Sequence, residues 1–136
     1  MDLQKCVLEI EEQIVVKTSL SAAFEGLIRQ LSEINEMPLT LERFPGGRWF
    51  RDLGDNTGHL WGFVQVIKPP ALLEICGPLF MSYPVAGHVQ FRLTPRSGGT
   101  TLTLRHRAVG LIDDDHRKNV TSGWQKILSG VKSECE

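Results

Sequence analysis

His106 is the histidine best placed for chemistry, because it is the only one that the sequence puts on the inner face of a sheet. In the segment 100–108 apolar and polar residues alternate, and Leu102, Leu104 and His106 fall on the apolar side. An imidazole there could orient the polar group of a ligand or act as a general base. We favour the simpler interpretation, a core histidine whose nitrogens are satisfied by backbone or water.

Glu12 is a second polar residue on an apolar face. From Leu8 to Val16 apolar residues alternate with polar ones as in a half-buried strand, and Glu12 is the exception on the apolar side. A carboxylate there could pair with His106. The simpler interpretation is that this edge of the strand reaches water.

Other catalytic patterns are missing from the chain. It lacks GxSxG, GxGxxG and Walker motifs, and its histidines show neither HxxxH nor HExxH spacing. We therefore assign no catalytic residue, no metal site and no cofactor, and we lean against an enzyme without excluding one.

Aromatic side chains are the other candidates for a site, since rings around a cavity would recognise an apolar ligand. Together with His106, the candidate ligand-binding residues are Trp49, Trp61, Phe63, Phe80, Tyr83, Phe91 and Trp124. For each ring the default interpretation is core packing. In the segment 59–67 both faces are largely apolar, so alternation does not settle which side faces inward. The outer side needs a cover, which a second copy of the chain could supply.

Composition limits the class of protein. The 136 residues suit a single domain spanning 1–136, and a formal net charge of −1 creates no field that attracts nucleic acid. Cysteines 6, 76 and 135 are odd in number and lack a CxxC spacing, which favours a reducing compartment. No secretory signal and no apolar run of membrane-spanning length is present. We expect a cytoplasmic protein that does not insert into membranes.

The elements that must position these residues follow from periodicity. An apolar stripe over 20–31 predicts a helix capped by Ser19 or Ser21. After it, short alternating segments separated by Gly and Pro predict an antiparallel sheet. We place these strands at 39–44, 48–53, 59–67, 72–76, 85–94 and 100–108. A turn at 96–99 would set Phe91 opposite Leu104 and Val89 opposite His106.

The last segment predicts a second amphipathic helix. Asp113 stands where an N-cap belongs, and the two acids after it favour the positive end of the helix dipole. The apolar stripe that follows is Val120, Gly123, Trp124, Ile127, Leu128 and Val131. Because glycine weakens a helix, we expect Gly123 to mark a close approach to another element, beside the Trp124 ring.

The order of these elements resembles the SRPBCC (START-like) superfamily, and within it the branch of activator of heat-shock-protein-ninety ATPase homologues. The matching features are the early helix with Phe24 and Leu27, the turn Gly46-Gly47-Arg48-Trp49, Pro69-Pro70 followed by Leu73, the Gly99-Thr100 turn leading to Leu102, Leu104 and His106, and Gly123-Trp124 with Leu128. The resemblance implies an α+β helix-grip (Bet v 1-like) fold, in which a curved antiparallel sheet wraps a long C-terminal helix around a hydrophobic cavity. Where relatives often carry an aromatic residue near the end of the strand that follows Pro-Pro, this chain has Cys76-Gly77-Pro78. The resemblance then implies a larger pocket, or one in which Phe80 or Tyr83 replaces the missing ring.

Three functions are compatible with this resemblance, because a fold alone does not choose one. The first is a binding protein for a hydrophobic or lipid-like small molecule, oriented by His106 and Tyr83. The second is a co-chaperone-like domain that acts on an ATPase of the heat-shock-protein-ninety type. The third is a cyclase or hydrolase that uses the same cavity, which the sparse polar content of the inner faces disfavours.

Overall fold

The computed structural model describes residues 3–79 and 84–136, so the candidate residues Phe80 and Tyr83 lie outside the described residues. In chain order the elements are η1 (Leu3–Cys6), β1 (Val7–Val16), α1 (Leu20–Leu31), β2 (Glu33–Ile34), β3 (Met37–Pro38), β4 (Thr40–Leu41), β5 (Arg48–Gly54), β6 (Thr57–Lys68), β7 (Leu72–Gly77), β8 (Val85–Arg96), β9 (Gly99–Gly110) and α2 (Asp114–Cys135).

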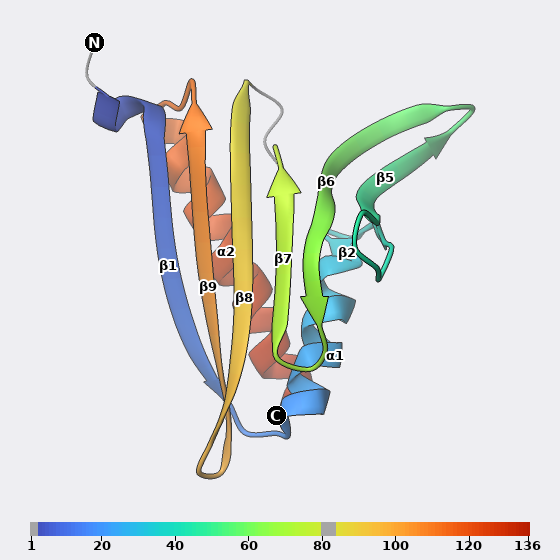
Figure 1. Cartoon of the computed structure of the whole chain (residues 1–136), viewed down its shortest axis with the longest axis vertical. Coiled ribbons are helices and arrows are strands. Elements are labelled where there is room, and N and C mark those ends of the chain that lie inside the picture. The colour runs from blue at the N-terminus through green and yellow to red at the C-terminus, as the bar shows by residue number, and fades with distance from the viewer. Residues whose placement is uncertain (1–2, 80–83) are drawn as a thin grey trace.

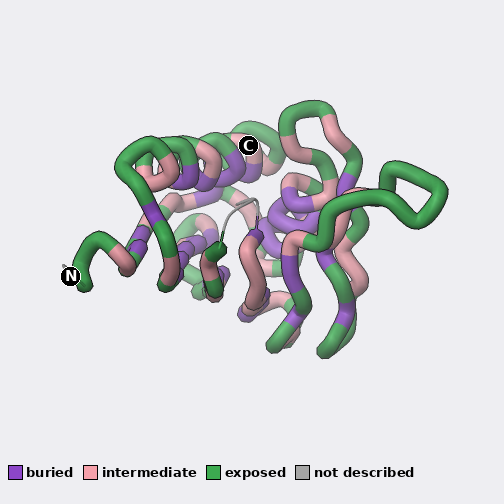
Figure 2. Tube along the Cα trace, turned by 90° about the horizontal axis from the view of Figure 1, so that it is seen from above, coloured by how far each residue is buried: buried purple, intermediate pink, exposed green. Residues whose placement is uncertain are grey.

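One antiparallel sheet of seven strands forms the body of the protein, in the order β1-β9-β8-β7-β6-β5-β4. The helices α1 and α2 lie on the same side of this sheet (Figure 1). Buried residues are concentrated between α2 and the curved sheet, whereas the end of the β5–β6 hairpin projects away and is exposed (Figure 2). The expected α+β helix-grip architecture is therefore confirmed.

The register of the β8–β9 hairpin agrees with the prediction from alternation. Phe91 pairs with Leu104 and Val89 pairs with His106. All four side chains are buried, because they lie on the face that α1 and α2 cover. The two-residue period fixed this register, since a slip by one residue would move every apolar side chain to the outer face.

Helix α2 begins as its acids predict. The Asp113 carboxylate accepts a hydrogen bond from the His116 backbone N–H at 2.9 Å, and Asp114 and Asp115 occupy the first turn. The buried residues of α2 are Val120, Trp124, Ile127, Leu128 and Val131, as the stripe predicts. In α1 the N-cap is Ser19, whose hydroxyl accepts from the Ala22 N–H at 3.2 Å.

The predicted strand 39–44 is wrong over most of its length. Only Thr40 and Leu41 form a strand. An unexpected hairpin of β2 and β3 precedes them, and a turn follows them in which the Phe44 N–H donates to the Glu42 carbonyl. This hairpin turns at Asn35 and Glu36, which both have positive φ angles, as a two-residue turn between antiparallel strands requires.

The close approach expected at Gly123 stays a prediction, but two other glycines lie at close approaches between the helices. A β-carbon on Gly26 would meet the Cys135 Sγ, and one on Gly130 would meet the Gln30 side chain, so these two glycines let α1 and α2 pack together. Within the described residues, no helix is long and apolar enough to cross a membrane.

Candidate functional site

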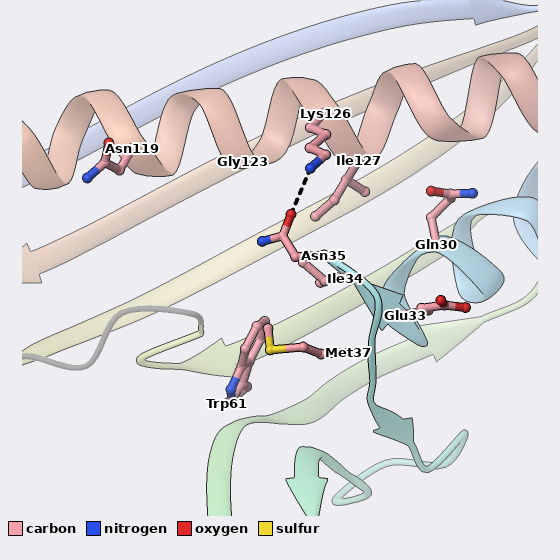
Figure 3. A pocket seen from close by; sticks show the side chains of 10 residues that line it. All are labelled: Gln30, Glu33, Ile34, Asn35, Met37, Trp61, Asn119, Gly123, Lys126 and Ile127. Carbon is pink, nitrogen blue, oxygen red and sulfur yellow. Dashed lines mark hydrogen bonds between the residues drawn. The ribbon is translucent and has the colours of Figure 1, made fainter.

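A pocket of about 330 Å³ lies between α2, the β2–β3 hairpin and Trp61 of β6. Figure 3 shows the side chains that surround it. Its apolar walls come from Ile34, Met37, Trp61 and Ile127, and its polar groups come from Gln30, Glu33, Asn35, Asn119 and Lys126, with Gly123 between them on α2. This volume falls within the range of small-molecule sites in proteins.

A β-bulge in β6 gives Trp61 its place in the pocket. Gly62 pairs with Trp49 and Leu60 pairs with Phe50, so Trp61 is the extra residue between two paired positions. A bulge interrupts the alternation of side chains and can redirect one of them. The Trp61 ring then contacts the ring of buried Trp49 edge to face, with 5.1 Å between ring centroids. One face of Trp61 is thus fixed against the core while the residue also lines the pocket.

The β2–β3 hairpin forms the wall opposite α2. Its turn residue Asn35 accepts a hydrogen bond through Oδ1 from Lys126 Nζ of α2, at 2.8 Å (Figure 3). This bond spans the pocket, so the hairpin is tied to the helix at its tip. At its base Leu39 N–H donates to the carbonyl of Ser32, which closes the loop that carries the hairpin.

In the part of the chain that the structure describes, the polar side of the pocket carries one cation, Lys126, and one anion, Glu33. Gln30 is positioned by Glu134, whose Oε2 accepts from its Nε2 at 2.8 Å. The pKa of Glu134 is lowered: burial opposes ionisation, but hydrogen bonds from Gln30 and Arg29 outweigh it. Within the described residues, no three His, Cys, Asp or Glu side chains are grouped so that they could hold a metal ion.

His106 lies in the core and is not part of the lining of this pocket. Its Nδ1 accepts a hydrogen bond of 2.8 Å from Trp124 Nε1, and the Trp124 ring also contacts Phe91 edge to face. Neither His106, Trp124 nor Phe91 is exposed at all. Burial, with a smaller contribution from His88, lowers the pKa of His106 to about 4. The imidazole is therefore neutral near neutral pH.

The structure brings together only part of the aromatic set that the sequence singled out. Trp61 lines the pocket, whereas Trp49 is fully buried and donates through Nε1 to the carbonyl of Leu31 at 2.8 Å. Phe63 is 43% exposed, two residues beyond Trp61 on β6. The predicted role of Phe63 and of the buried rings in ligand binding stays a prediction.

The suggested pair of Glu12 and His106 does not form. Glu12 is half-buried on the inner side of β1, and its carboxylate accepts from Gln125 Nε2 of α2 at 2.9 Å. His106 instead uses Nδ1 for Trp124. The register explains the difference, because β1 places Ile10, not Glu12, directly opposite His106.

Most pocket residues were missed from the sequence, because they come from three distant segments. Gln30, Glu33 and Asn35 follow one another around the end of α1, while Asn119 and Lys126 lie on the exposed side of the α2 stripe. The available signal was Asn35, a residue type that tolerates the positive φ of a two-residue hairpin turn, whereas Glu36 in the second position is not typical of one.

A curved antiparallel sheet that holds a long C-terminal helix defines the helix-grip class of the SRPBCC superfamily. Within that class, the chain belongs to the family described as Activator of Hsp90 ATPase homolog 1-like protein, whose model matches residues 24–136. No curated protein shows a significant sequence match to this chain.

Solved structures share the fold at low sequence identity. CV1439 from Chromobacterium violaceum is 15% identical with a TM-score of 0.73, over 94% of this chain and 96% of that protein. CalU16 from Micromonospora echinospora is 19% identical with a TM-score of 0.66, over 91% and 71%. The di-domain ARO/CYC StfQ from the steffimycin biosynthetic pathway is 15% identical with a TM-score of 0.70, over 98% of this chain and 52% of StfQ. The chain thus spans about half the length of StfQ.

Proposed function

We propose that this protein binds a small, mostly apolar molecule in the pocket between α2, the β2–β3 hairpin and Trp61. The observation that carries the proposal is the bulge at Trp61, which sends a large aromatic ring into a pocket whose remaining groups are a few polar side chains. Apolar walls with a small number of polar groups are typical of ligand sites. A cavity of this size accepts a molecule of at most a few hundred daltons.

The likeness to StfQ, from a biosynthetic pathway, supports this proposal at the level of the fold. An enzyme that uses the same pocket is less well supported. Among the described residues, the pocket lining has Glu33 and Lys126 as its ionisable groups, and Lys126 is already hydrogen bonded to Asn35. His106, the candidate general base, is buried outside the lining of this pocket.

Native mass spectrometry of the protein purified from its own host tests the proposal, with denaturing extraction to identify any adduct. The released compound is then titrated into Trp61→Ala and Phe44→Ala variants while intrinsic fluorescence is followed. Loss of the Trp61 ring should weaken binding by about tenfold or more, as truncation of a buried aromatic anchor does. Phe44→Ala is the matched control, because Phe44 is an exposed aromatic residue that does not line the pocket. Equal effects of the two substitutions would contradict the pocket as the site.

A second candidate, a co-chaperone-like interaction with an ATPase of the Hsp90 type, is favoured by the projecting β5–β6 hairpin. Leu53 is 52% exposed and Leu60 is 46% exposed there, on a hairpin end that no helix covers (Figure 2). Apolar groups that stay exposed can mark a protein contact, which a second copy of this chain could also supply. Stimulation of the ATPase by the wild type but not by a Leu53→Ser, Leu60→Ser variant would support this function. If the variant and the wild type have the same oligomeric state, the exposed leucines do not act through dimerisation.

A further inference from the structure

The β2–β3 hairpin is the wall of the pocket with the fewest attachments to the rest of the protein. Its two strands pair with each other and are not part of the seven-stranded sheet. Within the part of the chain that the structure describes, residues 33–38 make a single hydrogen bond to another element, from Lys126 Nζ of α2 to Asn35 Oδ1 at 2.8 Å. We call this bond the tether. An isolated two-stranded hairpin is marginally stable at best, so this wall depends on the tether and on its packing.

The other two walls of the pocket are held by the core. Helix α2 is anchored by buried residues that include Val120, Trp124 and Leu128. Trp61 lies against the buried Trp49 ring. A molecule that needs room to enter would therefore displace the hairpin before it displaced either of these walls.

The hairpin turns one apolar pair toward the pocket. Ile34 and Met37 are direct partners in the register, and both are half-buried and line the pocket (Figure 3). Glu36 and Pro38 are exposed. Because burial of this apolar pair is favourable, the hairpin should rest against the pocket or against a ligand in it. The flexible Met37 side chain can adapt its shape to either.

The tip of the hairpin is strained where the tether attaches. Asn35 and Glu36 have φ angles of 54° and 64°. Asparagine tolerates this region of backbone space, whereas glutamate rarely adopts it. Strain of this kind recurs in segments that change conformation during function.

We propose that the β2–β3 hairpin is a lid that swings away from α2 to admit the ligand, closes over it, and is held closed by the tether. Its hinges are the two ends of the hairpin, where the Leu39 N–H donates to the Ser32 carbonyl at 2.8 Å in both positions of the lid. This inference rests on the proposed function and adds how the ligand enters and leaves. Because the tether closes the lid with or without ligand, its strength should change the rates of entry and release together and leave Kd unchanged.

Stopped-flow fluorescence with the neutral dye N-phenyl-1-naphthylamine tests this inference, since an uncharged probe forms no ion pair with Lys126. Asn35→Asp should strengthen the tether by adding a charge and still tolerate the positive φ. It should lower the association and dissociation rate constants by about twofold or more. Asn35→Gly removes the tether and also accepts the positive φ, so both rate constants should rise by about fivefold. Kd should stay within about twofold of the wild type in both variants.

Two further variants show whether the tether itself sets the rates. Lys126→Ala should raise both rate constants as Asn35→Gly does, and the double variant should be no faster than either, because both substitutions remove the same bond. Asn119→Ala is the matched control, since Asn119 lines the pocket from the same helix but does not form the tether. This control should keep the rates of the wild type.

The dye also separates failure of the lid from failure of the pocket. Rate constants that do not follow the strength of the tether, with dye binding that is weakened by Trp61→Ala, would overturn this inference and leave the proposed function standing. A change in Kd through the dissociation rate alone would make the hairpin a fixed contact instead of a lid. Failure of the dye to bind, or binding that is unchanged in Trp61→Ala, would count against both proposals.

Discussion

Mild acid should weaken the fold through a single residue, His106. Its pKa falls from 6.5 to about 4 on folding, because burial disfavours the charged ring. At pH values between these two pKa values, the imidazole of His106 therefore binds a proton in the unfolded chain but not in the folded chain. Stability then rises with pH across this interval, and it is lost as the pH falls from near 6.5 toward 4.

The magnitude follows from the two pKa values. Linkage gives a loss of about 2 kcal/mol between about pH 7 and about pH 5, and roughly 3 kcal/mol once the folded state also titrates. Carboxylates add little above about pH 5. Glu25 and Glu42 accept hydrogen bonds from Arg43 and Arg48, which lower their pKa values, so both stay ionised there.

Urea unfolding at these two pH values, followed by tryptophan fluorescence, measures the effect. The wild type should lose about 2 kcal/mol that a His106→Phe variant does not lose, even though the variant starts from a lower stability. The two proteins share every carboxylate, so the difference between their losses of unfolding free energy from the higher to the lower pH reports on His106. Equal losses in the two proteins would refute the assignment of a neutral buried imidazole.

Three further outcomes are expected from the same structure. Asp113→Ala should lower the free energy of unfolding by about 1 kcal/mol through loss of the N-cap, and Asp114→Ala, which makes no cap, should cost less; thermal unfolding of both variants compares them. Phe91→Ala should cost about 3–5 kcal/mol, because it leaves a cavity against the Trp124 ring, as urea unfolding would show. Lys126→Ala removes the bond to Asn35, so amide hydrogens of the β2–β3 hairpin should exchange faster while those of β8 and β9 do not change.

The regular parts of the fold were predictable because their side chains repeat with the period of the element. The pairing of Val89 with His106 followed from alternation and one turn, and the N-cap of α2 followed from Asp113. In both cases the decisive interaction is local, or lies between strands that are adjacent in the chain.

The pocket was not predictable for the opposite reason. Trp61 leaves the alternating pattern through a bulge, which depends on how β5 pairs with β6. Gly62, directly after it, is consistent with a bulge but does not show which side chain is redirected. A second bulge in β6, between Val64 and Val66, explains why both faces of this strand look apolar. From the sequence, Lys126 is predicted to be a solvent-exposed helix residue. Only the structure shows that the β2–β3 hairpin places Asn35 within hydrogen-bond distance of it.

The charge of the proposed ligand depends on Lys126, the cation that lines the pocket. Its ammonium group has three N–H donors, and the bond to Asn35 Oδ1 uses one of them. If the pocket takes an anionic group, a second donor of Lys126 is available for it. Tetralin carboxylate should then bind more tightly than tetralin in a fluorescence titration, and Lys126→Ala should abolish the difference. Equal binding of the two compounds by the wild type would show that Lys126 does not select the ligand.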